Sequence, residues 1–337
     1  MRYIAELGQT HEGSIETAIA GIEAFAAAGA TDIKFQWLTP TGIARADAPR
    51  YWETGDDQDD QHDVFGRGVI PYTDWSPIID TCREHGVGFI TTPFDLEAVG
   101  AMQGYGLVEA KIASGDITNR LLIETVALAM DHCFLSTGGA NVTEIHQALS
   151  VFQANECEVT VLACTLSYPT VPQDAFVTRI ERLDDIIGHW HTVRGIGYSD
   201  HTLGVWSAGA ATAAGAVALE KHCTLGGDPA VCPDHEMALL PDEFASYVET
   251  SKNTRMAFLE APLGTSDSER AAVHGARRTL VLRRDMKAGD TVDDLAVIAL
   301  RPGPVDDEIG AWHRFNRTTQ LVEDLSAGTV LEYGHLT

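Results

Sequence analysis

Short apolar runs alternate with longer amphipathic segments eight times along the first two thirds of the chain. The segments at 16–30 and 76–86 place apolar residues at helical spacing and carry a glycine near their ends, which is typical of a helix C-terminus. Eight such strand–helix units predict a TIM (β/α)₈ barrel of the α/β class. A doubly wound sheet is the alternative, but no GxGxxG motif follows the first expected strand. The expected strands are Tyr3–Leu7, Asp32–Gln36, Gly88–Thr91, Glu109–Ala113, Cys133–Ser136, Val159–Ala163, Arg194–Tyr198 and Ala218–His222.

The second strand–helix connection, residues 39–75, is unusually long and contains the acidic run TGDDQDDQHD at 54–63. Its composition predicts a solvated loop. Long connections at the mouth of a barrel also form lids or interfaces, so that function is kept as a second interpretation.

The periodicity changes after the barrel region, residues 1–264. The polar segment 265–276 predicts a linker, and short strands and turns predict a small β-type domain over 277–337. Within it, DMKAGDTV at 285–292 is echoed by DLSAGTVL at 324–331, which indicates two related halves. A domain of this size has a marginal core, so we expect it to pack on the barrel or on a second subunit.

The 337 residues carry 23 basic and 49 acidic side chains, a formal net charge of −26. Binding to nucleic acid or to an anionic membrane needs a basic face, so this charge argues against both as partners. The six cysteines form no CxxC pair, which predicts buried free thiols in a reducing compartment. The longest apolar stretch, 205–219, is too short to span a bilayer, so we expect a cytoplasmic protein.

The active site of a TIM barrel lies at the C-terminal ends of its strands. Two of the five lysines, Lys34 and Lys111, fall there together with several hydroxyl side chains. Ammonium and hydroxyl groups together bind a small phosphorylated, carboxylated anion. The alternative is that each lysine only reaches past its strand end to solvent. The polar residues at the expected strand ends are Glu6, Lys34, Gln36, Thr92, Lys111, Ser114, Asp116, Ser136, Thr165, Tyr168, Ser199, His201 and His222.

Two histidines end neighbouring expected strands. Because the rings of His201 and His222 can reach one ion, they predict a divalent metal site, with Mn²⁺ as first choice and Zn²⁺, Co²⁺ or Fe²⁺ as alternatives. Each could instead be a hydrogen-bonded core residue. Glu6 is expected to act as a general base or to bind a sugar hydroxyl, unless it is the structural partner of Lys34. Asp234 lies in the loop after the eighth strand, which could fold over the mouth.

These residues belong to a series of motifs that resembles the N-acetylneuraminate (sialic acid) synthase family over essentially the whole chain. The C-terminal part, with RRTLVLRRDMKAGD at 277–290 and RPG at 301–303, resembles the antifreeze-like (SAF) domain of those synthases. In chain order the barrel motifs are AELGQTHEG (5–13), IKFQ (33–36), TTPFD (91–95), KIASGDITN (111–119), LSTGG (135–139), CTLSYPT (164–170), YSDHTLG (198–204) and LEKHCT (219–224).

The resemblance implies condensation of phosphoenolpyruvate with an open-chain N-acetylated amino sugar, such as N-acetylmannosamine or a 2,4-diacetamido sugar, with release of phosphate. A divalent metal held by His201 and His222, Mn²⁺ before Mg²⁺ or Co²⁺, would activate the sugar aldehyde. The residues that would hold phosphoenolpyruvate are Lys34, Thr92, Lys111, Ser114, Ser136 and Ser199. Those that would orient the sugar or move protons are Glu6, Gln36, Asp116, Tyr168 and Asp234.

Arg301 matches an arginine that, in this family, reaches from the small domain of one subunit to the N-acyl group in the barrel of its partner. The resemblance therefore implies a domain-swapped homodimer. Four positions depart from the family pattern. Three of them lie where they could change which sugar is accepted, whereas Leu166 replaces an Asn that helps to hold phosphoenolpyruvate in some members, so that contact is unfilled or taken by Ser167. The four are Thr10 and Leu166, each in place of Asn, Asp116 in place of Glu and Ala238 in place of Ser.

Two other functions fit the same residues less fully. A lyase could form a Schiff base through Lys111, but that chemistry needs a lysine in an apolar pocket, and Lys111 is expected among groups that bind anions. A non-catalytic carbohydrate-binding protein would bind sugar without consuming phosphoenolpyruvate.

Overall fold

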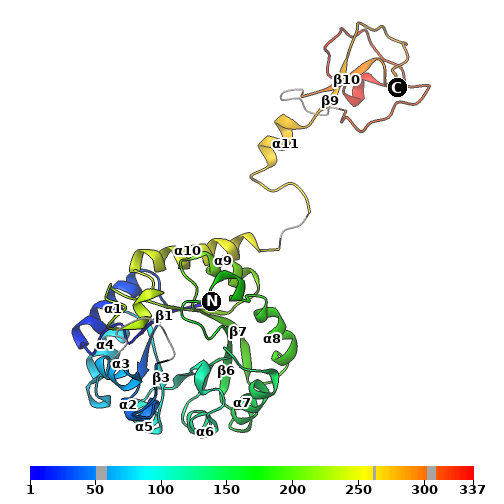
Figure 1. Cartoon of the computed structure of the whole chain (residues 1–337). Helices are drawn as coiled ribbons and strands as arrows, with labels where there is room; N and C mark the ends of the chain where they lie inside the picture. Colours follow the sequence, from blue (N-terminus) through cyan, green and yellow to red (C-terminus); the bar gives the residue numbers. More distant parts are fainter. Residues whose placement is uncertain (51–58, 261–262, 302–308) are drawn as a thin grey trace. The chain divides into compact units, whose positions relative to one another are not determined.

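The computed structural model describes residues 1–50, 59–260, 263–301 and 309–337. Eight parallel strands close into a barrel in sequence order, and helices surround it (Figure 1). This arrangement confirms the predicted TIM barrel and excludes a doubly wound sheet. The strands are β1 (Arg2–Gly8), β2 (Asp32–Trp37), β3 (Gly88–Pro93), β4 (Glu109–Ile112), β5 (His132–Ser136), β6 (Glu158–Cys164), β7 (Val193–Asp200) and β8 (Ala218–His222).

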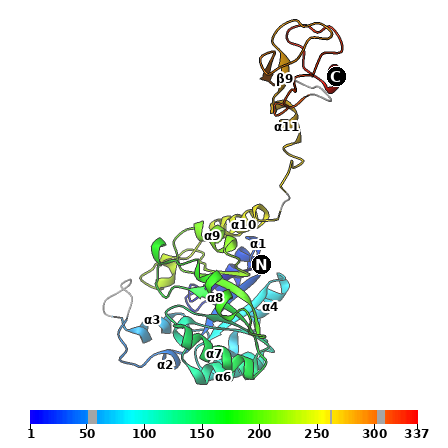
Figure 2. The same ribbon diagram turned by 90° about the vertical axis from the view of Figure 1, so that its right-hand side faces the viewer.

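The helices pack their apolar faces on the outside of the barrel, and Figure 2 shows several of them from a second direction. In the first helix, Ser14 Oγ accepts a hydrogen bond from Thr17 N at 3.1 Å, which caps the N-terminus, and Ile22 and Phe25 are buried. The helices are α1 (Ile15–Ala27), α2 (Pro40–Ile43), α3 (Gln61–Arg67), α4 (Ser76–Glu84), α5 (Leu96–Gly104), α6 (Arg120–Ala129), α7 (Val142–Ala154), α8 (Arg179–Ile187), α9 (Trp206–Ala213) and α10 (Pro241–Ala257). Short 3₁₀ turns are η1 (Tyr72–Asp74), η2 (Ser114–Asp116), η3 (Pro172–Asp174) and η4 (Pro233–Glu236).

The inside of the barrel changes from apolar to polar along its axis. A buried apolar cluster of strand residues, separate from the core between the strands and the helices, forms a floor inside the barrel. Because side chains alternate along a strand, the residue two positions beyond each member of this floor also points inward. These pairs run from Ile4 to Glu6, Ile90 to Thr92, Phe134 to Ser136, Leu162 to Cys164 and Ala218 to Glu220. The fold therefore places a polar layer directly above the floor, toward the C-terminal ends of the strands.

Several other predictions can be compared with the structure. All six cysteines are free and buried, which confirms the predicted buried free thiols; the reducing compartment stays a prediction. In the part of the chain that the structure describes, no helix is both long enough and apolar enough to cross a membrane. The long connection after β2 contains α2, α3 and η1. The first half of the predicted acidic run, residues 54–58, lies outside the described residues.

The chain divides into two compact units, Met1–Leu259 and Glu260–Thr337. The segment 265–276, predicted as a linker, contains a short helix, α11 (Arg270–Ala276). Beyond it, the second unit contains a two-stranded antiparallel sheet and a final 3₁₀ turn. These elements are β9 (Thr279–Leu282), β10 (Val297–Leu300) and η5 (Tyr333–His335).

The two repeated segments of the second unit, 285–292 and 324–331, lie against each other, and each accepts a hydrogen bond from the other. Asp285 Oδ1 accepts a hydrogen bond from Ala327 N at 2.7 Å, and Asp324 Oδ1 accepts one from Ala288 N at 3.0 Å. Equivalent positions of the two repeats thus make equivalent contacts, which is the relation that the sequence echo indicated.

At the N-terminal end of the barrel, Arg2 joins three strands. Its guanidinium donates to Asp32 Oδ2 at 2.9 Å and to Glu109 Oε1 at 2.6 Å. Burial opposes ionisation of Glu109, but hydrogen bonds from Arg2 and His132 and their charges outweigh it and lower its pKa to about 2. The ionised carboxylate of Glu109 therefore stabilises the folded barrel.

We predict that Glu109→Gln lowers the free energy of unfolding of the barrel by roughly 1–3 kcal/mol at neutral pH. Because the pKa of Glu109 is depressed from 4.5 in the folded state, this stabilisation is complete above about pH 4.5 and is lost as the pH falls toward 2. Urea unfolding of both proteins at pH 7 and pH 3 measures the difference. A difference that stays the same at pH 3 contradicts the prediction. Glu158→Gln, which breaks an exposed ion pair with Arg194, is the control and should change stability little.

Candidate active site

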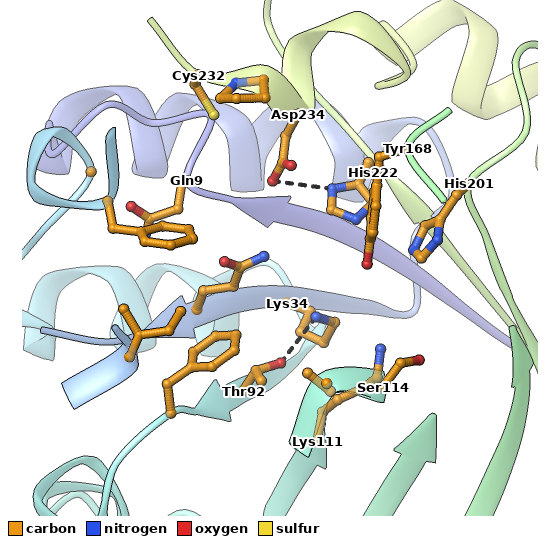
Figure 3. Close-up of a pocket in the computed structure, with 18 of the residues that line it drawn as sticks. Gln9, Lys34, Thr92, Lys111, Ser114, Tyr168, His201, His222, Cys232 and Asp234 are labelled. Carbon is orange, nitrogen blue, oxygen red and sulfur yellow. Dashed lines mark hydrogen bonds and ion pairs between the residues drawn. The ribbon is translucent and has the colours of Figure 1, made fainter. Parts of the chain in front are cut away.

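A cavity of about 450 Å³ lies at the C-terminal ends of the barrel strands, and Figure 3 shows part of its wall. This is the end at which TIM barrels place their active sites. All the predicted site residues line it except Glu6 and Arg301. The predicted residues in its wall are Lys34, Gln36, Thr92, Lys111, Ser114, Asp116, Ser136, Tyr168, Ser199, His201, His222 and Asp234.

The two exceptions have different places in the fold. Glu6 does not line the cavity, but it is fully buried, forms an ion pair with Lys34 and accepts a hydrogen bond from Gln36 Nε2 at 3.1 Å. Both of these partners line the cavity, so Glu6 lies behind its wall and contacts the residues that form it. Arg301 is exposed and directly follows β10 in the second unit. Its role stays a prediction.

Two lysines and two carboxylates form a buried charge cluster at the base of the cavity. Lys111 Nζ lies 2.5 Å from Glu220 Oε1, and Lys34 Nζ lies 3.9 Å from Glu220 Oε2. Lys34 also pairs with Glu6 and donates a hydrogen bond to Thr92 Oγ1 at 3.2 Å. Isolated charges are unfavourable at this depth, so each of these groups depends on the others for compensation.

The cluster keeps Lys34 and Glu220 ionised. Burial works against the charge of Lys34, but the carboxylates of Glu220 and Glu6 outweigh it and raise the pKa of Lys34 above its ordinary value. Burial also opposes ionisation of Glu220, whereas the ammonium groups of Lys111 and Lys34 lower its pKa to about 2. Two positive and two negative charges therefore face one another, and an arriving anion has to compete with the carboxylates for the lysines.

Glu220 was not predicted from the sequence. It lines the cavity, and its Oε1 accepts a hydrogen bond from Ser199 Oγ at 2.9 Å. The signal was present in the alternation of β8, because Glu220 and His222 lie two positions apart and so face the same side. Lys221, between them, points the other way.

Some hydroxyl groups in the wall are prepared to bind a ligand. Ser136 Oγ is buried and has no hydrogen-bond partner among the residues that the structure describes. A buried polar group without a partner is unfavourable, so a ligand oxygen placed there would gain a hydrogen bond that the protein alone does not supply. Ser114 Oγ accepts a hydrogen bond from Gly138 N at 3.0 Å and also hydrogen-bonds with the Cys164 side chain, so its partners belong to the wall itself.

His201 directly follows the end of β7, and His222 is the last residue of β8. The two rings lie side by side, with their centroids 5.4 Å apart (Figure 3). Tyr168 packs on His201 at a centroid distance of 4.1 Å. His201 Nδ1 donates to the main-chain oxygen of Thr165 at 2.8 Å, so Nε2 is the ring nitrogen that remains to bind a metal. His222 Nδ1 lies 3.4 Å from Asp234 Oδ2.

This donor set fits a metal that takes further ligands from outside the chain. Across the described ranges, no group of three or more histidine, cysteine, aspartate or glutamate side chains could hold an ion by itself. The two imidazoles could therefore bind a divalent ion only with water or substrate oxygens completing its coordination.

A further part of the wall comes from the long connection between β2 and β3 and is largely apolar. Ile43, Val64 and Phe65 line the cavity there, next to Phe94 from the end of β3. Arg67 is also in this wall, and its guanidinium pairs with Asp59 at 2.6 Å. None of these residues was predicted as part of the site, because α2 and α3 are too short to produce a helical periodicity in the sequence.

Two of the positions that depart from the family pattern lie in the cavity wall, namely Asp116 and Leu166. Thr10 is buried, and its hydroxyl lies 2.7 and 2.9 Å from two main-chain carbonyl oxygens. Neither Thr10 nor Ala238 lines the cavity. Of the positions expected to influence the choice of sugar, Asp116 is therefore the one in the wall.

The NeuB family model matches residues 21–261, well over half of the chain. The chain belongs to the NeuB family. The N,N'-diacetyllegionaminic acid synthase of Campylobacter jejuni is 30% identical to it over 305 residues, covering 89% of this chain and 90% of the relative. The pseudaminic acid synthase of Helicobacter pylori is 27% identical over 305 residues, covering 89% and 88%.

A solved structure agrees with this assignment. The crystal structure of N-acetylneuraminic acid synthetase from Leptospira borgpetersenii, in complex with citrate, has a TM-score of 0.69 to this NeuB-family chain at 28% identity. The match covers 80% of this chain and 89% of that one. The protein is thus a NeuB-family synthase. Its relatives are named for different nonulosonic acids, so family membership alone does not fix the sugar. The family match ends at residue 261, at the start of the second unit.

We predict that Glu220→Gln makes the cavity bind inorganic phosphate several-fold more tightly while lowering the melting temperature. The amide cannot compete with an anion for Lys111, yet it leaves the buried lysines without a counter-ion. Isothermal titration calorimetry and thermal unfolding measure the two effects. Asp116→Asn removes a carboxylate from the same wall but outside the lysine cluster, so it should change phosphate affinity much less. Unchanged or weaker phosphate binding by Glu220→Gln contradicts the prediction.

Proposed function

We propose that this chain catalyses the metal-assisted condensation of phosphoenolpyruvate with an open-chain N-acylated amino sugar, which yields a nonulosonic acid and inorganic phosphate. One observation carries the proposal: the buried lysines Lys34 and Lys111 lie in the same cavity as His201 and His222. The lysines suit a small, highly charged anion, and the histidines suit an ion that binds an aldehyde oxygen. Family membership supports the same class of reaction.

The lysines would bind the carboxylate and phosphate groups of phosphoenolpyruvate. Thr92 already accepts from Lys34, so its own proton is free for a substrate oxygen. Ser136, which lacks a partner among the described residues, would donate in the same way. Ser114 and Ser199 complete the set of hydroxyl donors. Substrate would thus replace Glu220 as the partner of the lysines.

A divalent metal, Mn²⁺ in first place and Mg²⁺ or Co²⁺ otherwise, supplies Lewis acid activation of the sugar aldehyde when His201 and His222 hold it. Carbon 3 of phosphoenolpyruvate forms a bond to the aldehyde carbon, whose oxygen takes up a proton. Water adds to carbon 2 of phosphoenolpyruvate. The bond between carbon 2 and the phosphate oxygen then breaks, and phosphate leaves, so that one water is consumed for each phosphate released.

The remaining polar groups of the wall would orient the sugar and move its protons. Burial raises the pKa of Asp116, which suits it to hold a proton nearer neutral pH than an exposed aspartic acid does. Tyr168 and Asp234 lie against the two histidines, close to where the aldehyde would bind. Glu6 would act through Gln36, whose amide it fixes.

The apolar wall favours one class of sugar. Ile43, Val64, Phe65 and Phe94 offer surface for methyl groups and no hydrogen bonds for hydroxyl groups. The second acyl methyl group of a 2,4-diacetamido sugar would pack there, so we favour such a sugar over N-acetylmannosamine.

The second unit is proposed to be an antifreeze-like domain that completes the site of another subunit. Its support is the sequence resemblance over 277–303 and the exposure of Arg301. In a domain-swapped homodimer, Arg301 would contact the N-acyl group of the sugar bound in the partner's barrel.

The direct test is phosphate release from phosphoenolpyruvate with Mn²⁺ and a panel of 2-acetamido and 2,4-diacetamido sugars. We expect release that requires both sugar and metal, that stops with EDTA and that is fastest with a 2,4-diacetamido sugar. Covalent trapping of Lys111 by borohydride would instead support the lyase. Sugar binding without phosphate release from any member of the panel would support a non-catalytic carbohydrate-binding protein.

His201→Ala and His222→Ala should each weaken Mn²⁺ binding and reduce turnover by roughly 100-fold or more while the barrel stays folded. Phosphoenolpyruvate should still raise the melting temperature of both variants, because the lysines that bind it are intact. Full activity in either variant rules out this metal site. His146→Ala, on the outer helix α7, is the matched control.

Mixing His222→Ala with Arg301→Ala subunits should restore activity if the site is shared between subunits. After random exchange of equal amounts, half the dimers are mixed and each has one intact site, so about a quarter of wild-type activity is expected. Demonstrated exchange without recovered activity contradicts the swapped dimer.

A further inference from the structure

A second buried charge pair lies behind the cavity, on the reverse face of β7 and β8. Lys221 Nζ lies 3.2 Å from Asp200 Oδ2, and both side chains are completely buried. The two residues are paired in register across the strands, and neither lines the cavity. Their neighbours along the two strands face the other way and do line it, namely Ser199, His201, Glu220 and His222.

The pair is held by hydrogen bonds from the turn that follows β7. Asp200 Oδ1 accepts from Thr202 N at 2.9 Å and from Thr202 Oγ1 at 2.8 Å. Asp200 Oδ2 accepts from Ser207 Oγ at the start of α9. Lys221 Nζ donates to the main-chain oxygen of Thr202 and lies 6.0 Å from the centroid of the Tyr247 ring. Both charged side chains thus have polar or aromatic partners, and they lie between the barrel strands on one side and α9 and α10 on the other.

This arrangement fixes the backbone around both histidines. Asp200 and Thr202 flank His201 in the chain, and Lys221 immediately precedes His222. We propose that Asp200, Lys221 and Thr202 form a positioning cluster that sets the separation and orientation of the two imidazoles, and through them the affinity of the chain for its divalent metal. The inference rests on the metal-binding role proposed above for the histidines.

Stability alone does not account for such a pair. Removing two charges from water costs about as much as their attraction returns, so apolar side chains of similar volume often hold two strands together at least as well. Hydrogen bonds, however, constrain direction as well as distance. Thr202 donates hydrogen bonds to Asp200 and accepts one from Lys221, and these bonds define the conformation of the turn. Apolar contacts alone would not determine that conformation.

The test uses the full-length double variant Asp200→Asn/Lys221→Met, which removes both charges together and so leaves neither buried without its partner. We expect circular dichroism like that of the wild type and phosphoenolpyruvate affinity within about twofold, since Lys34 and Lys111 are untouched. The dissociation constant for Mn²⁺, measured by electron paramagnetic resonance, should rise by about 10–100-fold. The visible absorption spectrum of the Co²⁺-loaded protein should change as well, because it reports the geometry of the ligands.

A milder variant keeps the experiment decisive if the double variant does not fold. Thr202→Val preserves shape and both charges and removes only the hydroxyl that Asp200 accepts from. It should weaken Mn²⁺ binding several-fold. The control Arg2→Met/Glu109→Gln removes a partly buried ion pair at the other end of the barrel. It should lower stability without changing Mn²⁺ affinity.

Wild-type Mn²⁺ affinity together with a wild-type Co²⁺ spectrum, in either folded variant, overturns the positioning role while leaving the proposed function intact. A different result tests the proposed function itself. If the wild type binds Mn²⁺ no more tightly than His201→Ala does, the histidines are not the metal site, and the positioning role falls with them.

Discussion

The mutual compensation of four buried charges is the constraint on which the rest of the site depends. Lys34 pairs with Glu6 and Lys111 pairs with Glu220 directly above an apolar floor, where a buried charge without a partner is strongly unfavourable. Because these groups come from four different strands, the cluster exists only when the barrel is closed. An anion that binds here exchanges with a carboxylate as the partner of lysines that are already buried, so the protein buries no further charge of its own on binding.

Much of this arrangement is encoded in periodicity that can be seen in the sequence. The eight expected strands agree with the observed ones to within two residues at either end, because buried parallel strands are short, continuous apolar runs between amphipathic helices. Once the barrel is assumed, the strand ends identify Lys34, Lys111, His201 and His222, all of which line one cavity. The strict alternation of a strand also implies Glu220, because it lies two positions before His222 and so faces the same side of β8.

Other features depend on information that local pattern does not carry. The apolar wall with Val64 and Phe65 comes from short helices in a polar connection, where no periodicity can develop. Similarly, α11 spans only a few residues of a polar segment and resembled a linker. The contacts of Arg301 with a second subunit depend on how separate units assemble, and pattern within one chain does not specify that.

The order of residues in β8 has a consequence for how the barrel folds. Glu220 and His222 face the cavity and Lys221 faces the helices, so a shift of this strand by one residue would exchange all three. A misaligned β8 would bring Lys221 toward Lys34 and Lys111 and would leave Asp200 without its cation. Repulsion among three lysines makes that alternative pairing unfavourable. The charges around the cavity therefore also favour the correct register of β8.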